Sequence, residues 1–257
     1  MSSRVIAIAN QKGGVGKTTT AVNLAASLAA AERRTLVIDV DPQANATSGL
    51  GHPVRDVARS VYDWLLERAA FDEVALGTEL QTLRLVPSTP ALAGAEIELV
   101  EVGARESRLR TVLASVRDRF DYVLVDCPPS LGLLTLNALV AADSVMVPLQ
   151  CEYYALEGLS HLVETIERVR DRLNPALRVE GVLLTMFDGR NSLAREVADE
   201  VRGHFAGRVF ETVIPRNVRL SEAPSHGRPI LLYDVQSKGC KGYLELAKEL
   251  MTGNGAA

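Results

Sequence analysis

A glycine-rich loop with two lysines near the N-terminus, Asn10–Thr20, constrains the fold most strongly. An apolar run, Arg4–Ala9, precedes this loop, and an alanine-rich segment with helical spacing follows it. A strand, a glycine loop and a helix in this order form a phosphate site, because the backbone N–H groups of the loop and the positive end of the helix dipole face the same anion. We therefore expect Lys17 to reach the β- and γ-phosphates of a nucleotide and the Thr18 hydroxyl to bind Mg²⁺.

The loop differs from the usual phosphate-loop pattern at two positions. Gln11 stands where a glycine is usual, and Lys12 adds a second lysine. A single triphosphate needs only one lysine from its own subunit. Lys12 is therefore either a solvated surface lysine or a cation that points away from the nucleotide of its own chain, and the residues alone do not decide between these roles.

Acidic residues end two of the predicted strands. The continuous apolar runs Thr35–Val40 and Phe120–Asp126 are typical of strands buried in a parallel sheet. The carboxyl ends of such strands face the crevice where ligands bind. An apolar strand that ends in Asp is the Walker B arrangement, so we expect Asp126 to hold Mg²⁺, often through water. Asp39 and Asp41 lie at the end of the first strand; either of them alone could be a turn cap, but two acids beside a phosphate loop favour a role at the nucleotide.

Strands and helices alternate along the rest of the chain. Further strands are predicted at 83–86, 144–149, 179–186 and 209–214, and helices at 18–31, 57–69, 106–119 and 156–173. This alternation predicts an α/β protein with a three-layer P-loop NTPase fold, in which helices cover both faces of a mostly parallel, twisted sheet. The length of 257 residues and the 47% hydrophobic content suit one domain, 1–257, with residues 248–257 as a frayed tail.

The composition excludes several classes of protein. The formal net charge of −4 gives no sign of nucleic-acid binding, so a DNA-binding face would require local clustering of arginine. Cys127, Cys151 and Cys240 form no CxxC pair, which favours buried thiols over a zinc site or a disulfide framework. We see no signal peptide and no apolar run near the ~20 residues of a membrane span, so we expect a cytoplasmic protein.

Four segments together resemble one known family. Lys12–Thr19 resembles the deviant Walker A loop of the ParA/MinD group of P-loop ATPases. Asp39–Asn45 and Asp126–Gly132 narrow the resemblance to the ParA/Soj chromosome and plasmid partition proteins. Ile214–Ser225 extends the similarity to nearly the whole chain.

This resemblance implies an ATPase that uses ATP and Mg²⁺. The expected phosphate-binding residues are Lys12, Gly13, Gly14, Val15, Gly16, Lys17, Thr18 and Thr19. The resemblance also implies that Asp41 positions the attacking water, as a catalytic residue beside Lys12 and Lys17, and that Asp39 supports the Mg²⁺ site.

The resemblance further places the nucleotide base near residues 215–217. Pro215 and Asn217 follow the predicted strand 209–214 at its ligand-facing end, and the amide of Asn217 can both donate to and accept from an adenine edge. Met186 and Asp188 are expected to line the same pocket. The alternative for Asn217 is a turn cap.

Arginine is the basic residue of the C-terminal third. Between Glu167 and Arg228 there are eleven arginines and nine acidic residues, and composition alone favours salt-bridged helix faces. The resemblance implies instead that Arg190 and Arg219 bind the DNA backbone without sequence preference, with Arg216 nearby as a further contact. Such binding weakens steeply with salt.

The function implied is a nucleotide-dependent switch for DNA partition. We expect a homodimer in which each Lys12 reaches the nucleotide of the partner subunit. The dimer is expected to bind double-stranded DNA on the nucleoid without sequence preference. It should hydrolyse ATP slowly until a ParB-like partner stimulates it. One alternative is a MinD-like membrane switch, which the absence of a basic amphipathic helix in the tail disfavours. Another is a metabolic enzyme similar to dethiobiotin synthetase, for which the sequence shows no clear second-substrate motif.

Overall fold

The computed structural model describes residues 3–101, 103–152, 155–205 and 207–253. Its strands form one seven-stranded sheet in the order β3-β4-β2-β5-β1-β6-β7, in which only β3 runs antiparallel to its neighbour. The strands are β1 (Arg4–Ile8), β2 (Thr35–Asp39), β3 (Leu76–Gly77), β4 (Leu83–Val86), β5 (Tyr122–Asp126), β6 (Ser144–Gln150) and β7 (Arg178–Thr185). The sheet confirms the predicted α/β class.

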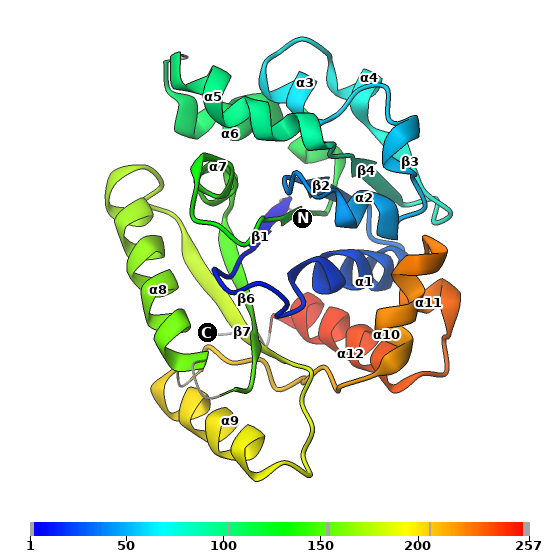
Figure 1. Ribbon diagram of the computed structural model, residues 1–257, viewed down its shortest axis with the longest axis vertical. Helices are drawn as coiled ribbons and strands as arrows, with labels where there is room; N and C mark the ends of the chain where they lie inside the picture. The colour runs from blue at the N-terminus through cyan, green and yellow to red at the C-terminus, as the bar shows by residue number, and fades with distance from the viewer. Residues whose placement is uncertain (1–2, 102, 153–154, 206, 254–257) are drawn as a thin grey trace.

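Helices cover both faces of this sheet, as Figure 1 shows. They are α1 (Lys17–Ala30), α2 (Asn45–Gly49), α3 (Val61–Leu65), α4 (Phe71–Val74), α5 (Ala95–Glu98), α6 (Arg108–Ala114), α7 (Leu133–Ala141), α8 (Ala155–Arg172), α9 (Ser192–His204), α10 (Val218–Glu222), α11 (Ile230–Tyr233) and α12 (Lys238–Thr252). One hydrophobic core joins the sheet to α1, α2 and α10–α12, and the other joins it to α3–α9. None of the helices that the structure describes is long and apolar enough to cross a membrane.

The central strands are apolar because both of their faces are covered. Every residue of β2 and β5 is buried, which explains why their sequences are continuous hydrophobic runs that end in Asp. The register pairs Asp39 with Asp126, and Ile8 with Asp126 on the other side. The two acids and the start of the phosphate loop therefore meet at one edge of the sheet. The three cysteines are buried and free, as predicted.

The predicted strand 209–214 is wrong. This segment makes only the isolated bridges Val182↔Val209 and Phe187↔Pro215 with the β7 side of the sheet. The ring of Phe210 packs against the backbone of Gly181, where a Cβ would lie 2.7 Å from Phe210 Cε2. The segment is therefore apolar because it packs against the edge of the sheet, although it adds no strand to it.

Two predicted helices are shorter than expected, and the tail is more ordered. The helix predicted at 57–69 is only α3, because Ser60 caps its first turn in a capping box with Asp63. The helix predicted at 106–119 is α-helical only in α6. Residues 248–252 were expected to fray but belong to α12, whose buried face includes Leu250. Residues 254–257 lie outside the described part of the chain.

Candidate nucleotide site

The phosphate loop connects β1 to α1 in a conformation that depends on glycine. Gly14 and Gly16 have φ angles of 74° and 89°, and Gly16 is the N-cap of α1. The space beside Gly13 and Gly14 is open, since a Cβ at either position would meet no atom within 4 Å. Thr185, at the end of β7, donates a hydrogen bond of 2.8 Å from Oγ1 to the carbonyl oxygen of Val15. The hydrogen bond from Thr185 thus holds one side of the loop, and the space beside Gly13 and Gly14 is left open for an anion.

Lys17 lies inside this loop and is buried. Its Nζ donates a 3.0 Å hydrogen bond to the carbonyl oxygen of Lys12. Burial lowers the pKa of Lys17, while the nearby Asp126, Cys127 and Asp41 act in the opposite direction. The structure therefore places the ammonium group between the loop and the acidic edge of the sheet.

Asp39 organises the segment that follows β2. Its Oδ1 accepts from the backbone N–H of Asp41 at 3.1 Å, and its Oδ2 accepts from the N–H and the hydroxyl of Thr47 at 2.9 and 2.7 Å. Burial raises the pKa of Asp39 to about 6, although these hydrogen bonds favour its charged form. Both of its oxygens are engaged within the chain, so Asp39 can support a metal site by its charge and by fixing the Asp41 turn.

Asp126 has the character expected of a cation ligand. It is fully buried, and within the described residues neither carboxylate oxygen has a hydrogen-bond partner. Burial, and then the charge of Asp39, raises its pKa well above the ordinary value, whereas the nearby Thr18 hydroxyl and then Lys17 act to lower it. Buried polar atoms without partners are rare in folded proteins, and a divalent cation with its water shell would satisfy both oxygens. The residues present fit Mg²⁺, because the hydroxyl of Thr18, in the first turn of α1, lies near this carboxylate.

Asp41 and Lys12 occupy the rim of the site. Asp41 is buried, and its Oδ1 accepts a 2.9 Å hydrogen bond from the N–H of Gln43, which is the turn-cap role that the sequence left open. Lys12 is half-exposed and its Nζ lies 2.6 Å from Oε2 of Glu152, just after β6. Sequence reasoning missed Glu152, although its position at the end of a parallel strand marks the same edge of the sheet.

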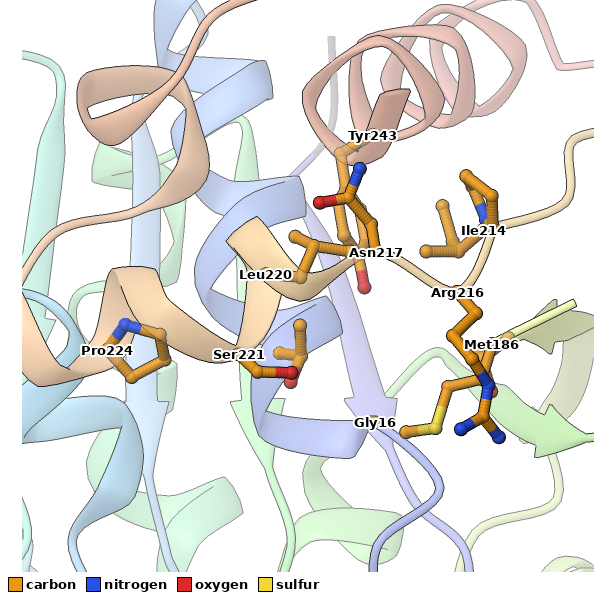
Figure 2. Close-up of a pocket in the computed structure, with 12 residues that line it drawn as sticks. Gly16, Met186, Ile214, Arg216, Asn217, Leu220, Ser221, Pro224 and Tyr243 are labelled. Atoms are coloured by element: carbon orange, nitrogen blue, oxygen red, sulfur yellow. The ribbon is translucent and has the colours of Figure 1, made fainter. Parts of the chain in front are cut away.

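A pocket of about 230 Å³ lies beside the phosphate loop (Figure 2). Its lining residues come from the loop and α1, the end of β7, the segment around α10, and α12: Gly16, Thr19, Thr185, Met186, Ile214, Pro215, Arg216, Asn217, Leu220, Ser221, Pro224 and Tyr243. The sequence prediction thus finds Met186, Pro215 and Asn217 in one pocket. Tyr243 was missed because nothing in its local sequence marks it; its hydroxyl lies 3.2 Å from Thr20 Oγ1.

Asn217 has the turn-cap role that the sequence offered, and it also lies in the wall of this pocket. It lines the pocket, and its Oδ1 accepts a 2.9 Å hydrogen bond from the N–H of Arg219 and so caps α10. Its side-chain NH₂ group is therefore the part that can donate to a base. Asp188 is not among the lining residues; its carboxylate binds Arg190 instead.

The three candidate DNA-binding arginines lie in two adjacent segments. Phe187 donates from its N–H to the carbonyl of Ile214 at 3.0 Å, and Arg216 donates to the carbonyl of Phe187 at 3.1 Å. These bonds hold the segment that carries Arg190 beside the one that carries Arg216 and Arg219.

Comparison with known proteins agrees with this geometry. Residues 3–179 match the family model described as an AAA domain. The chain is 60% identical to the chromosome partitioning protein ParA of Myxococcus xanthus, over 96% of this chain and 88% of the relative. It is 57% identical to the sporulation initiation inhibitor protein Soj of Bacillus subtilis, over 96% of this chain and 98% of the relative. The chain belongs to the ParA/Soj family of ATPases.

The fold of this ParA/Soj family member also matches solved structures. A Mycobacterium smegmatis protein described as a cobyrinic acid a,c-diamide synthase, solved with ADP and magnesium, is 39% identical with a TM-score of 0.86, over 98% of this chain and 94% of that one. The P-loop ATPase domain of the family thus accounts for the sheet, the phosphate loop and the acidic edge.

Proposed function

We propose that this chain is an ATP-driven switch for DNA partition, which binds DNA as an ATP-bound dimer and releases it after hydrolysis. The observation that carries the proposal is the difference in environment between the two lysines of the loop. Lys17 is buried among the acids of its own chain, whereas Lys12 stands half-exposed on the rim. Because Lys12 is exposed, its ammonium group can bind the triphosphate of a second subunit.

ATP and Mg²⁺ are the cofactors of this switch. The phosphates bind to the backbone N–H groups of the loop, and Lys17 exchanges the carbonyl of Lys12 for a phosphate oxygen. Thr18 and Asp126 would hold the Mg²⁺ ion, with Asp39 supporting them, and the ion would supply positive charge to the phosphate oxygens. The base lies in the pocket at Met186 and Asn217.

Asp41 positions the attacking water. The hydrogen bond from the Gln43 N–H holds Oδ1 and so restrains the carboxylate, and we expect Oδ2 to accept from the water. A fixed acceptor lowers the barrier by orienting the water rather than by strong base chemistry. We therefore expect slow turnover alone, and stimulation by a ParB-like, centromere-binding partner at the dimer interface.

Dimer formation depends on the γ-phosphate. Lys12 Nζ lies 2.6 Å from Oε2 of Glu152 in its own chain. The partner's triphosphate carries more charge than this single carboxylate, so it draws Lys12 across the interface, and hydrolysis removes that attraction. Gly13, beside open space, allows the close approach of the second subunit.

DNA binds to the paired arginine faces of the dimer. Arg190 and Arg219, with Arg216 nearby, contact the phosphate backbone, so DNA binding would not require a positive net charge of the whole chain, which is −4. Such a protein works in the cytoplasm, associated with the nucleoid. Whether the cargo is a chromosome or a plasmid does not change this chemistry.

The decisive experiment measures both dimer formation and DNA binding. We expect light scattering to show dimers of the wild-type chain with a non-hydrolysable ATP analogue, and sedimentation with plasmid DNA to require that analogue. Lys12→Ala should bind the analogue and stay monomeric, while Lys248→Ala, which removes an equal charge from the exposed face of α12, should dimerise normally.

The same experiment tests the rival functions. Sedimentation with anionic liposomes instead of DNA would support a membrane switch, and binding to neither would support a metabolic enzyme, the class to which the name of the Mycobacterium smegmatis protein belongs. The higher identity to ParA and Soj relatives favours partition. A Lys12→Ala chain that dimerises with normal affinity would refute the role of this lysine.

A further inference from the structure

Arg190 is held by an acid two residues before it. Its Nε and one Nη lie 2.9 and 2.8 Å from the two oxygens of Asp188, and its backbone N–H donates to Oδ1 at 3.1 Å. The guanidinium group lowers the pKa of Asp188 to about 2, so this carboxylate is charged at any physiological pH. The side chain of Arg190 is 92% exposed, so Asp188 holds this guanidinium group at the surface where DNA would bind.

Arg219 is neutralised in the same way on the adjacent segment. One Nη lies 2.8 Å from Oε2 of Glu222, and its Nε lies 3.5 Å from Oδ2 of Asp234. Tyr233 also donates to Glu222 at 3.2 Å, which fixes that carboxylate in place. Two arginines of this face, Arg190 and Arg219, thus stand beside three carboxylates, which offset the charge of both guanidinium groups.

The segment that carries Asp188 begins in the base pocket. Met186 lines that pocket, and its φ angle of +49° is unusual for a residue other than glycine and costs free energy. Its Cε lies 4.0 Å from the position of a Cβ on Gly16, so its side chain reaches over the phosphate loop, as Figure 2 shows. Thr185, just before it, is bonded to the loop carbonyl of Val15. Three residues therefore connect the phosphate loop to the acid that holds Arg190.

We propose that Asp188 is a positioning residue that keeps Arg190 bound until a base fills the adjacent pocket. The proposal rests on the proposed DNA-binding function and adds to it how nucleotide binding changes the DNA face. A base in the pocket contacts Met186, and the strained backbone at that residue is where the segment adjusts. Movement of Asp188 away from Arg190 then frees the guanidinium fork for a DNA phosphate, which binds it in the same bidentate way.

A double-mutant cycle in the full chain tests this inference. The affinity for a labelled DNA duplex is measured by fluorescence anisotropy, with and without ATP, for the wild type, Asp188→Asn, Arg190→Ala and the double variant. We expect Asp188→Asn to raise the ATP-free affinity about two- to fivefold and to reduce the ratio between the affinities with and without ATP. In the Arg190→Ala background, Asp188→Asn should have no effect.

Asp56→Asn is the matched control, because it removes one negative charge from an exposed acid whose own Arg neighbour lies 3.7 Å away. An equal gain from Asp188→Asn in both backgrounds, or a similar gain from Asp56→Asn, would mean that Asp188 acts only through general charge, and the inference would be overturned. If the wild type binds DNA and Arg190→Ala weakens that binding but Asp188→Asn does not change it, the inference is overturned while the DNA-binding function stands. Wild type that binds no DNA under either condition would overturn the DNA-binding function together with it.

Discussion

Two regions of this chain differ in how their charged groups are placed. One is the phosphate edge, where the glycine loop meets Asp39 and Asp126, and the other is the arginine face, which carries Arg190 and Arg219. At the phosphate edge Lys17, Asp39 and Asp126 are buried, and burial displaces the pKa of each from its ordinary value. At the arginine face Arg190 and Arg219 are exposed, and their partners hold them as ion pairs. The first region has charged groups that lack full compensation, and the second has charged groups that are already compensated.

This difference separates what each region can do. Uncompensated buried charges make the phosphate edge a strong and specific site, because a triphosphate and a cation relieve an existing electrostatic cost. Compensated exposed charges make the arginine face a weak site whose strength depends on whether the pairs open. If the proposed function holds, tight nucleotide binding and adjustable DNA binding coexist in one small fold.

Among the substitutions that test the difference between the two regions, Lys17→Ala is expected to have the largest effect. It removes the buried cation that meets the phosphates, so we expect nucleotide affinity to fall about a hundredfold, measured by titration calorimetry. The variant should fold at least as stably as the wild type without nucleotide, because burial disfavours the charged form of Lys17. A nucleotide affinity within threefold of the wild type would remove the contrast between the two regions.

A smaller effect is expected at Gly239, in the first turn of α12, which packs against Leu220 of α10. A Cβ on Gly239 would lie 2.6 Å from Cγ of Leu220, a residue that lines the base pocket one position after Arg219. We expect Gly239→Ala to reduce the free energy of unfolding by about 1–3 kcal/mol through overpacking, measured by urea denaturation.

Gly203 provides the control for this variant. A Cβ at this position in α9 would meet no atom within 4 Å, so Gly203→Ala should stabilise the chain by up to about 1 kcal/mol through helix propensity. Equal effects of the two substitutions, in sign and size, would show that the packing of Gly239 against Leu220 does not constrain the segment.

The smallest effect is expected for Arg219→Ala on the exposed face. Each dimer would lose two phosphate contacts, so the slope of log affinity for DNA against log salt should become shallower by about 2. Anisotropy titrations between low and physiological salt measure this slope. An unchanged slope with a large loss of affinity would indicate that Arg219 supports the structure of α10 rather than contacting phosphate.

The phosphate edge could be predicted from sequence to a large extent because its features are local. Buried parallel strands are read as continuous apolar runs, and β2 and β5 were found with their terminal acids in place. The glycine loop was likewise found between β1 and α1, where local order alone determines its position. Where burial accompanies a local pattern, the pattern identifies the element.

The remainder depended on contacts between distant segments. Residues 209–214 have the composition of a strand, but the packing of Phe210 against Gly181 decides how they meet the sheet. The partners Thr47 of Asp39 and Glu152 of Lys12 come from other segments, so no motif contains them. Asp188 was predicted in the base pocket, and only the fork to Arg190 shows where its carboxylate lies.

The hydrogen bond from Lys17 Nζ to the carbonyl of Lys12 has a consequence for the rate of nucleotide capture. This bond holds the long side chain within the folded chain, so its rotamer entropy is lost during folding rather than on nucleotide binding. The ammonium group merely substitutes one oxygen for another. Association should accordingly proceed without a slow rearrangement of the loop, and the lifetime of the complex, more than its speed of formation, should distinguish ATP from weaker ligands.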